Sequence, residues 1–579
     1  MHDLIVKNAA IIDGLGNPQR HGDVAVAGGR IVDIGSIKER SARTVDADGR
    51  VLAPGIIDLH THYDAQLTWD AKASPSPALG VTTIVIGNCG FGIAPCPPQM
   101  RTLMAQNLSV VEGMNLDALL AGVQWDFESF GEYLEFLRSR NTVPNVAAFV
   151  GHTPVRTSVM GEAGSERAAT EDEVAAMRKL VRQAMDAGAI GFASSVGANH
   201  IGYGGKPMPS RLADERELDS LVGVLADVGR GVFHVGAGEG ERLSVEALEK
   251  IAKRIGRPVV FSPVFYNPAF PERARQRLAA CEDAQARGAE LYGQVSCQPM
   301  SHDFTLDNAY LMYSLEAWQP LQSADRDTIS RTLRDPAFRE RYRAGFKNPK
   351  KGLIFYGNWR MVDIAACADP ANLPLEGRNI AEIAQERGAD PVDVFFDLAL
   401  DENLATVFNA KVMNSDEKAV GELIRSTAGV IAQSDAGAHL EFFCDAGFGL
   451  YMFGRWVREL KAMDLVEAVH RVTGMQAKLY RIPDRGRIAP GAFADMILLD
   501  PARIGVSKTR RIRDMPAGAT RLVREPVGLD GVWVNGVEVF DGKDYVAGRG
   551  EPGQATRPGQ SGGPGHAGGP GQILDKFGV

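Results

Sequence analysis

Residues 54–64 read PGIIDLHTHYD, an apolar run that ends in two histidines one residue apart. The Pro-Gly pair marks a turn, and the apolar residues after it predict a buried strand. Side chains two residues apart on a strand point the same way, so His60 and His62 can both reach one divalent cation. Asp58 or Asp64 is close enough to bind the cation or to hold an imidazole in place. On its own, an H-x-H pair fits two surface histidines equally well.

Apolar runs of strand length recur along the chain and alternate with amphipathic helical stretches, a pattern typical of βα units and a parallel sheet. We expect core strands at residues 56–59, 82–87, 145–150, 190–193, 231–235, 258–262, 290–295 and 429–432. Eight such strands predict a (β/α)8 TIM-like barrel, whose functional site lies at the carboxyl ends of the strands. His60 and His62 stand at such an end. A doubly wound sheet is the alternative, but no glycine-rich phosphate loop follows a strand.

Short alternating strands occur near both ends of the chain, for example ADMILLD at residues 494–500. We therefore expect an α/β protein in which a small β-sandwich domain is formed from both chain ends. Its two parts are predicted at residues 1–54 and 481–546, on either side of a barrel at residues 55–480.

Two further segments differ in composition from the barrel pattern. The stretch from about 300 to 350 is rich in aromatic and charged residues and predicts an insertion, whose aromatics we interpret mainly as packing. Residues 547–579 form a Gly/Pro-rich tail, which we expect to be mobile up to about residue 571. The apolar side chains at residues 573–579 could dock on a neighbouring part of the protein.

The overall composition excludes several classes of function. Among 579 residues the net charge is −9, which argues against nucleic acid or a membrane surface as partner. The sequence has no basic leader before an apolar core and no run of ~20 apolar residues, so we expect a cytoplasmic protein. Six scattered cysteines without a CxxC pair predict neither a disulfide framework nor a zinc ribbon. A homo-oligomer is left open.

Two more predicted strands end in side chains that bind metals. Residues 80–90, GVTTIVIGNCG, deliver Cys89, and residues 429–439, GVIAQSDAGAH, deliver Asp435. A thiolate beside a cation has its pKa lowered, and a carboxylate there could bind the metal and take a proton from its water. Each also has an ordinary interpretation, Cys89 as a small buried side chain and Asp435 as a helix cap.

Three other histidines are further candidates for contact with a metal or a substrate, namely His152, His200 and His439. For His439, a hydrogen-bonded structural role in its loop is an equal alternative.

The motifs HTH near residue 60, GNCG near 89, GHTPVR at 151–156 and SDAGAH near 435 stand in an informative order. Together they resemble the amidohydrolase superfamily, in its N-acyl-D-amino-acid deacylase (D-aminoacylase)-like branch. DRGRIAPGAFAD at 484–495 is similar to that superfamily's return from barrel to sandwich, and the resemblance spans roughly residues 4–545. It implies a metal-dependent hydrolase with a barrel and a sandwich made from both ends.

The resemblance also implies roles for individual residues. His60, His62, Cys89 and Asp435 match positions that bind Zn²⁺ in the family, and Asp435 also matches the catalytic acid/base. The substrate would be a small-molecule amide.

Two family ligands are missing from this chain. Relatives carry a histidine in a T-H-M-R motif, which falls near Gly236 here, and another in S-H-L-K, where this chain reads SPVF at 262–265. Pro263 cannot bind a metal, and Phe265 replaces the lysine that helps to hold a substrate carboxylate. His234, two residues before Gly236, faces the same side of its strand and is a candidate displaced ligand. We therefore expect one Zn²⁺ ion and regard a second site as doubtful.

These expectations define a hydrolase of a linear amide, such as an N-acyl amino acid, that uses a metal-activated water with Asp435 as acid/base. One alternative is ring opening of a cyclic amide or imide, which the lack of a clear barrel lysine suited to carboxylation disfavours. The other is a catalytically silent relative that binds a ligand or builds an assembly. The missing histidines favour that alternative, whereas the four retained ligands oppose it.

Overall fold

The computed structural model describes residues 1–197, 200–236, 243–322, 324–347, 353, 355–546 and 568–578. The chain divides into two compact units. The first comprises Met1–Val264, Arg275–Cys297 and Gly421–Val579, and the second comprises Phe265–Ala274 and Gln298–Val420.

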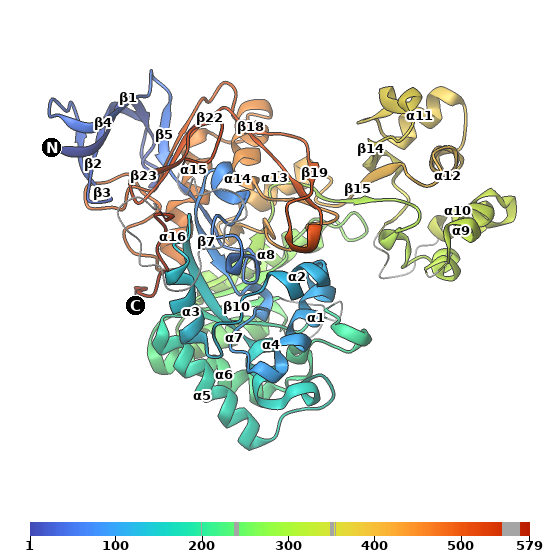
Figure 1. Ribbon diagram of the computed structural model, residues 1–579, viewed down its shortest axis with the longest axis horizontal. Coiled ribbons are helices and arrows are strands. Elements are labelled where there is room, and N and C mark those ends of the chain that lie inside the picture. Colours follow the sequence, from blue (N-terminus) through green and yellow to red (C-terminus); the bar gives the residue numbers. More distant parts are fainter. Residues whose placement is uncertain are drawn as a thin grey trace. The chain divides into compact units, whose positions relative to one another are not determined.

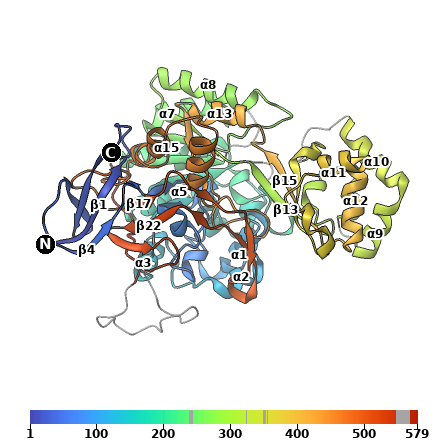
Figure 2. The ribbon, with the colours of Figure 1, turned by 90° about the horizontal axis from the view of Figure 1, so that it is seen from above.

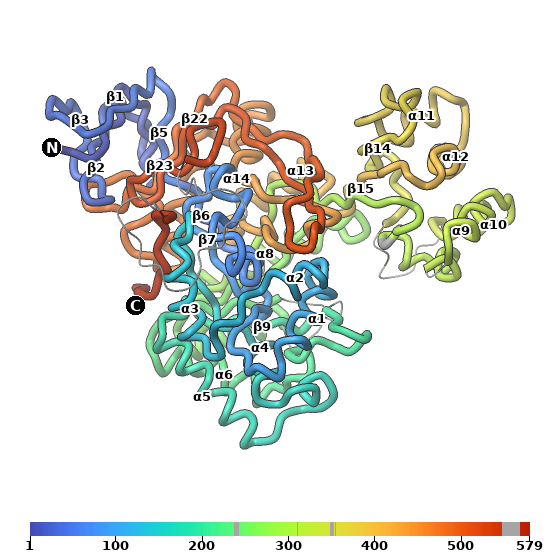
Figure 3. Tube along the Cα trace, viewed as in Figure 1, coloured from blue at the N-terminus to red at the C-terminus, as the bar shows by residue number. Residues whose placement is uncertain are grey.

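One sheet of the first unit is built from both ends of the chain, in the order β23-β22-β17-β5-β1-β2-β3, with β4 beside β1. Figure 2 shows β17 and β22 next to the strands of the amino end, and the blue and red traces meet in Figure 3. Leu52 pairs with Leu498 across the junction, and both are in the core of this sheet. The predicted β domain from both chain ends is thereby confirmed. Its strands are β1 (His2–Ile11), β2 (Arg20–Ala27), β3 (Arg30–Gly35), β4 (Ser41–Asp46), β5 (Val51–Pro54), β17 (Met496–Leu499), β22 (Leu529–Val534) and β23 (Val537–Phe540).

The second sheet is an eight-stranded parallel barrel in the order β6-β7-β8-β9-β10-β11-β12-β16. All eight strands predicted from apolar runs are present. Its strands are β6 (Ile56–Asp58), β7 (Val81–Ile86), β8 (Asn145–Gly151), β9 (Gly191–Ser195), β10 (Val232–Gly236), β11 (Val259–Ser262), β12 (Leu291–Val295) and β16 (Gly429–Ile431).

The barrel closes where the chain continues beyond β6 and β16. Thr61 and Ala436 form a parallel bridge, and the N–H of His62 donates to the carbonyl of Ala436 at 2.8 Å. The hydroxyl of Ser434 donates to the carbonyl of His60 at 3.2 Å. The segments that close the ring are therefore the same segments that carry the HTH and SDAGAH motifs.

Helices pack on the outside of the strands: α5 contacts β8, α6 contacts β9 and β10, and α7 contacts β11 and β12. Figure 1 shows α6 beside β10. A capping box joins Thr170 and Glu173 at the start of α5. The helices of the first unit are α1 (Arg101–Val111), α2 (Leu116–Gly122), α3 (Phe130–Ser139), α4 (His152–Met160), α5 (Glu171–Ala187), α6 (Glu215–Val228), α7 (Val245–Ile255), α14 (Phe448–Tyr451), α15 (Leu465–Val472) and α16 (Gly474–Leu479). Helices α8 (Arg273–Ala286) and α13 (Glu417–Arg425) span boundaries between the two units.

The second unit has a core of its own. In its described residues, an antiparallel sheet in the order β13-β15-β14 shares this core with helices α9, α10, α11 and α12. The predicted insertion at about 300–350 lies within this unit. Trp318, Phe338 and Tyr342 are buried together in its core. The predicted domain boundaries stay predictions. The elements are β13 (Met300–Phe304), α9 (Arg326–Arg334), α10 (Pro336–Lys347), β14 (Val362–Ala366), α11 (Ile380–Arg387), α12 (Pro391–Asp401) and β15 (Val407–Met413).

Two short ribbons complete the described strands of the first unit. One pairs β18 (Gly505–Val506) with β21 (Pro526–Val527), and the other pairs β19 (Arg510–Ile512) with β20 (Arg521–Val523).

The end of the chain docks on β8. Ile573 forms a parallel bridge with Val146, and Phe577 is buried in the barrel core cluster. Docking begins earlier than the composition predicts, because Gly569 and Gly571 already donate their N–H groups to backbone carbonyls of the loop before β8. Backbone hydrogen bonds need no side chain, so glycine can make them. Most of the predicted mobile tail, residues 547–567, lies outside the described residues.

Candidate metal centre

His60 and His62 follow β6 and lie side by side inside the barrel mouth. Their ring centroids are 5.2 Å apart, and both residues are buried. Thr61 between them points the other way, and its hydroxyl donates to the carbonyl of Val85 at 2.8 Å. The alternation predicted from sequence therefore brings both imidazoles to one place.

Cys89 joins them from the turn after β7. Its Sγ lies 3.5 Å from Nε2 of His60, and one ligand atom from each of His60, His62 and Cys89 lies within 4.8 Å of the others. Cys89 has a left-handed backbone with φ 55°, an uncommon conformation for a residue with a side chain. The amide of Asn88 holds this turn by donating to the carbonyl of Val85 at 2.8 Å.

Asp435 approaches from the turn after β16. Its Oδ1 lies 3.2 Å from Nε2 of His60 and 3.7 Å from Nε2 of His62. Asp435 is left-handed at φ 45°, as are Gln433 at φ 68° and His439 at φ 53°. Backbone strain of this kind is a feature of functional sites, where the surrounding fold holds it in place.

The other nitrogen of each imidazole has a buried partner. Nδ1 of His60 donates to Oε1 of Gln294 at 2.6 Å, and Nδ1 of His62 lies 3.2 Å from Oε1 of Glu112. These contacts leave both Nε2 atoms facing Asp435, as in metal sites where an outer partner orients each imidazole. Sequence reasoning missed both partners. Gln294 was detectable as a buried polar residue in the strand LYGQV, whereas Glu112 follows helix α1 without a motif.

The charges of the four groups are coupled. Burial alone would lower the pKa of His60, but the charges of Cys89 and Asp435 outweigh it and raise the pKa to about 9. Burial raises the pKa of the Cys89 thiol, but the positive charges and hydrogen bonds of His60 and His62 bring it down to about 7. The charge of His60 likewise overcomes burial at Asp435 and holds the pKa of that carboxyl below its usual range. The anions of Cys89 and Asp435 thus face the imidazoles of His60 and His62, and the protons of these imidazoles occupy the place of a cation. Imidazole, thiolate and carboxylate donors together suit Zn²⁺.

His234 points into the barrel, but both of its ring nitrogens are engaged. Nδ1 accepts the N–H of Cys89 at 3.3 Å, and Nε2 donates to the hydroxyl of Ser262 at 3.1 Å. At Gly236, a Cβ would lie 2.9 Å from Oγ of Ser195 and 3.5 Å from Cε1 of His200, so neighbouring side chains fill that space.

His200 and His439 lie near the cluster but outside it. The ring of His200 packs on Phe91, with centroids 5.1 Å apart, and its Nδ1 lies 2.5 Å from the hydroxyl of Ser195. The ring of His439 stacks on Phe443 at 4.9 Å. Burial lowers the pKa of each to about 4, so both rings are neutral at neutral pH.

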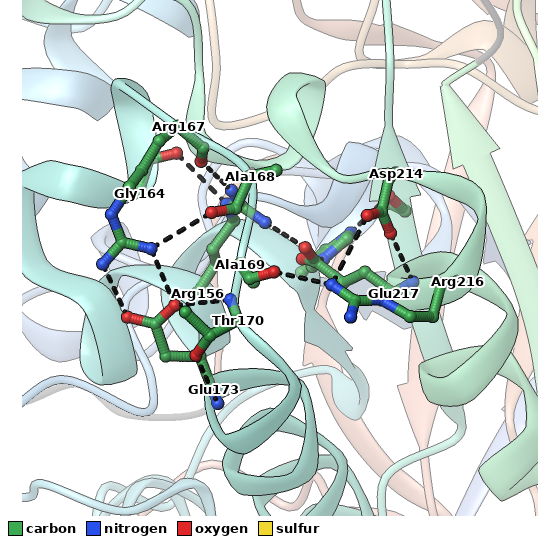
Figure 4. Close-up of polar contacts among 12 residues, drawn as sticks. Arg156, Gly164, Arg167, Ala168, Ala169, Thr170, Glu173, Asp214, Arg216 and Glu217 are labelled. Carbon is green, nitrogen blue, oxygen red and sulfur yellow. Dashed lines mark hydrogen bonds and ion pairs between the residues drawn. The ribbon is translucent and has the colours of Figure 1, made fainter.

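His152 belongs to a separate buried network. Its ring nitrogens lie 2.8 Å from the hydroxyl of Ser194 and 2.8 Å from Oε1 of Glu217. Arg156, one turn further along α4, pairs with the other oxygen of Glu217 (Figure 4). The side chains of His152, Arg156 and Glu217 are all fully buried. The GHTPVR motif therefore joins helices α4 and α6 instead of reaching the histidine pair.

Asp58 and Asp64 support backbone near the cluster. Oδ1 of Asp58 accepts the N–H of His60 at 3.3 Å, and Oδ2 of Asp64 accepts the N–H of Gly87 at 3.1 Å. Burial raises the pKa of Asp58 to about 7 and that of Asp64 to about 6.

A parallel barrel with imidazoles, a thiol and a carboxylate gathered at the ends of its strands is the architecture of a metal-dependent barrel hydrolase. The sequence matches the amidohydrolase family over residues 43–341 and 357–540, and the chain belongs to that family, in its D-aminoacylase-like branch. The resemblance seen in the motifs is thereby confirmed.

The sequence is similar to named relatives over nearly the whole chain. D-aminoacylase of Alcaligenes xylosoxydans xylosoxydans is 30% identical over 551 residues, which cover 93% of this chain and 94% of the relative. N-acyl-D-glutamate deacylase of the same organism is 27% identical and covers 93% of each chain.

Solved structures give the same assignment. N-acyl-D-glutamate deacylase of Bordetella bronchiseptica, complexed with zinc and a phosphonate mimic of the tetrahedral intermediate, is 25% identical with a TM-score of 0.64. The match covers 99% of this chain and 100% of that one. A D-aminoacylase studied for its binuclear metal centre has the same identity and TM-score, and the match covers 100% of both chains.

Among the described residues, no helix is both long and apolar enough to cross a membrane.

Proposed function

We propose that the chain is a metal-dependent hydrolase of linear amides, with N-acyl amino acids as the substrate class. The observation that carries this proposal is the convergence of His60, His62, Cys89 and Asp435 at the mouth of the barrel. The relatives named for D-aminoacylase and N-acyl-D-glutamate deacylase activity support the substrate class.

A cation would be held by His60, His62, Cys89 and Asp435, whose imidazole, thiol and carboxylate groups meet at this place. A bound divalent cation supplies a Lewis acid for the amide carbonyl and lowers the pKa of a water toward ~7. Zinc suits a set of nitrogen, sulfur and carboxylate donors, and a zinc-bound relative supports that choice.

Asp435 moves the proton in this proposal. Its Oδ1 faces the Nε2 atoms of both histidines, and its depressed pKa keeps it ionised, so that it can accept a proton. It takes the proton of the attacking water and returns it to the departing nitrogen, which then leaves as a neutral amine.

One ion is expected instead of two. By the motif resemblance, Gly236 and Pro263 fall where the family has histidines, and neither residue has a side-chain donor. Both nitrogens of His234 are occupied by Cys89 and Ser262, so this ring does not replace them. In the D-aminoacylase relative with a binuclear centre, one metal activates and the second attenuates, which is compatible with a single-ion enzyme.

The experiment is a metal assay coupled to hydrolysis. We expect one zinc ion per chain and release of free amino acid from a panel of N-acyl D- and L-amino acids. Asp435→Asn should lower kcat ~100-fold or more, because general acid–base catalysis contributes that much. Cys96→Ala is the control, since Cys96 is buried away from the cluster, and its hydrogen bond is to its neighbour Pro97.

Three results would refute the proposal. Absence of stoichiometric metal excludes this mechanism, and two tightly bound ions exclude the single-ion form. Hydrolysis of hydantoins or dihydropyrimidines without hydrolysis of any N-acyl amino acid would assign the site to cyclic amides instead.

A further inference from the structure

We infer that Glu112 is a positioning residue. Its carboxylate orients His62 for the cation, and its main chain links His62 to the turn that carries Asp435. This inference rests on the metal site proposed above. Glu112 stands at the end of helix α1, and its side chain is only 3% exposed.

The carboxylate of Glu112 is directed at imidazoles. Among the ion pairs of the described residues, its partners are His62, with Oε1 3.2 Å from Nδ1, and His439, with Oε2 3.7 Å from Nε2. Burying a carboxylate is costly unless it is paired, and His62 is the ring that pairs with it, because the ring of His439 is neutral. Such a contact fixes which nitrogen of His62 carries the proton, and it leaves Nε2 turned toward Asp435.

The main chain of Glu112 makes a second link. Its carbonyl accepts the N–H of His439 at 2.6 Å, and its own N–H donates to the carbonyl of Leu108 at 3.0 Å. His439 has a left-handed backbone and lies four residues after Asp435 in the same turn. Helix α1 therefore holds that turn through one residue, which also contacts His62.

Gly113 allows this close approach. It has φ +54°, and a Cβ there would lie 2.7 Å from the ring of Phe442 and 3.1 Å from Nδ1 of His439. A side chain at this position would push Glu112 away from the turn. The Glu-Gly pair thus brings helix α1 against the residues that follow Asp435.

The two imidazoles differ in their partners. His60 donates to the neutral amide of Gln294, whereas His62 faces a carboxylate. A carboxylate partner makes an imidazole a stronger electron donor to a metal than an amide does. Removing the Glu112 charge should therefore weaken the bond between His62 and the cation more than the bond between His60 and the cation.

The test measures metal affinity in metal-depleted protein, by competition between the protein and a chelator for Zn²⁺. Glu112→Ala should lower the affinity ~10–100-fold, the usual cost of losing an outer partner of a metal-bound imidazole. Glu112→Gln keeps an acceptor oxygen without the charge and should fall between wild type and Glu112→Ala. Asp117→Asn removes an exposed carboxylate in helix α2 and serves as the charge control.

A second readout separates orientation from general damage to the fold. With Co²⁺ in place of Zn²⁺, the visible ligand-field bands report the donor geometry. They should shift in Glu112→Ala, return toward the wild-type position in Glu112→Gln, and stay unchanged in Asp117→Asn.

The outcomes are distinct. If wild type binds no metal, the proposed function fails and this inference with it. If wild type binds metal and Glu112→Ala has the same affinity and cobalt spectrum, only the role of Glu112 is overturned. If Glu112→Ala does not fold, the Zn²⁺ affinity of Glu112→Gln is the deciding measurement. An affinity about threefold or more below wild type supports the role of Glu112, and an affinity within about twofold of wild type overturns it.

Discussion

Sγ of Cys89 lies 3.5 Å from Nε2 of His60, and Cys89 has a left-handed backbone at this place, with φ 55°. The same contact lowers the pKa of the thiol, because the His60 charge favours a thiolate. Burial in apolar surroundings does the opposite at Cys96, where it raises the thiol pKa to about 12.

In metal-depleted protein, Cys89 should react with iodoacetamide at pH 7.5 at least ~10-fold faster than Cys96, because only the thiolate is nucleophilic. Mass spectrometry of the labelled peptides measures both rates at once. Added Zn²⁺ should protect Cys89. Equal rates at the two cysteines, or no protection, would contradict its role as a ligand.

Metal affinity should rise with pH between 6 and 9. The cation must displace the proton of His60, whose pKa is raised to about 9, and it needs the thiolate of Cys89, whose pKa is about 7. Each displaced proton makes the affinity rise about tenfold per pH unit while its group is still protonated. Affinities at pH 6, 7, 8 and 9 give the slope, and a flat profile would show that these two groups are not displaced.

Gly437→Ala should disrupt the site. A Cβ at Gly437 would lie 2.7 Å from the carbonyl of His62, and the residue has φ +97°. Gly491 is the matched control, because its φ is +86° and a Cβ there meets no atom within 4 Å. Both substitutions should lower the free energy of unfolding by ~1–2 kcal/mol because of the backbone conformation, but only Gly437→Ala should also lose metal. Thermal unfolding and metal content distinguish the two effects.

Glu217→Ala should destabilise the fold without affecting the metal ligands. It leaves Arg156 buried without its carboxylate, and breaking a buried pair in this way costs about 3–5 kcal/mol. The measurement is urea unfolding of the metal-depleted protein. Glu166→Ala, which breaks the exposed pair with Lys206, should leave the unfolding midpoint unchanged. A midpoint for Glu217→Ala equal to wild type would show that the pair is not needed for stability.

The barrel and four residues of the cluster could be predicted from sequence because each sits at a strand end. Period-two alternation places His60 and His62 on one side, and apolar runs lead directly to Cys89 and Asp435. All eight strands were predictable for the same reason: parallel barrel strands are buried on both faces and read as continuous apolar runs.

Other features leave no such pattern. Glu112 reaches His62 because helix α1 ends beside the turn after Asp435, a tertiary relationship that no spacing encodes. His152 stands in the GHTPVR motif, but its partner Glu217 comes from a different helix. The docked segment near Ile573 follows a Gly/Pro-rich stretch, and composition does not reveal the backbone hydrogen bonds that help to hold it.

The pairing of β5 with β17 bears on the order in which the molecule assembles. Pro54 lies opposite Met496, so the sheet at the amino end cannot be completed until the whole barrel sequence has left the ribosome. Until then the edge of β5 is unpaired, and such an edge can recruit strands from other chains. Nascent chains stalled before residue 496 should therefore depend on chaperones more than chains stalled after residue 540.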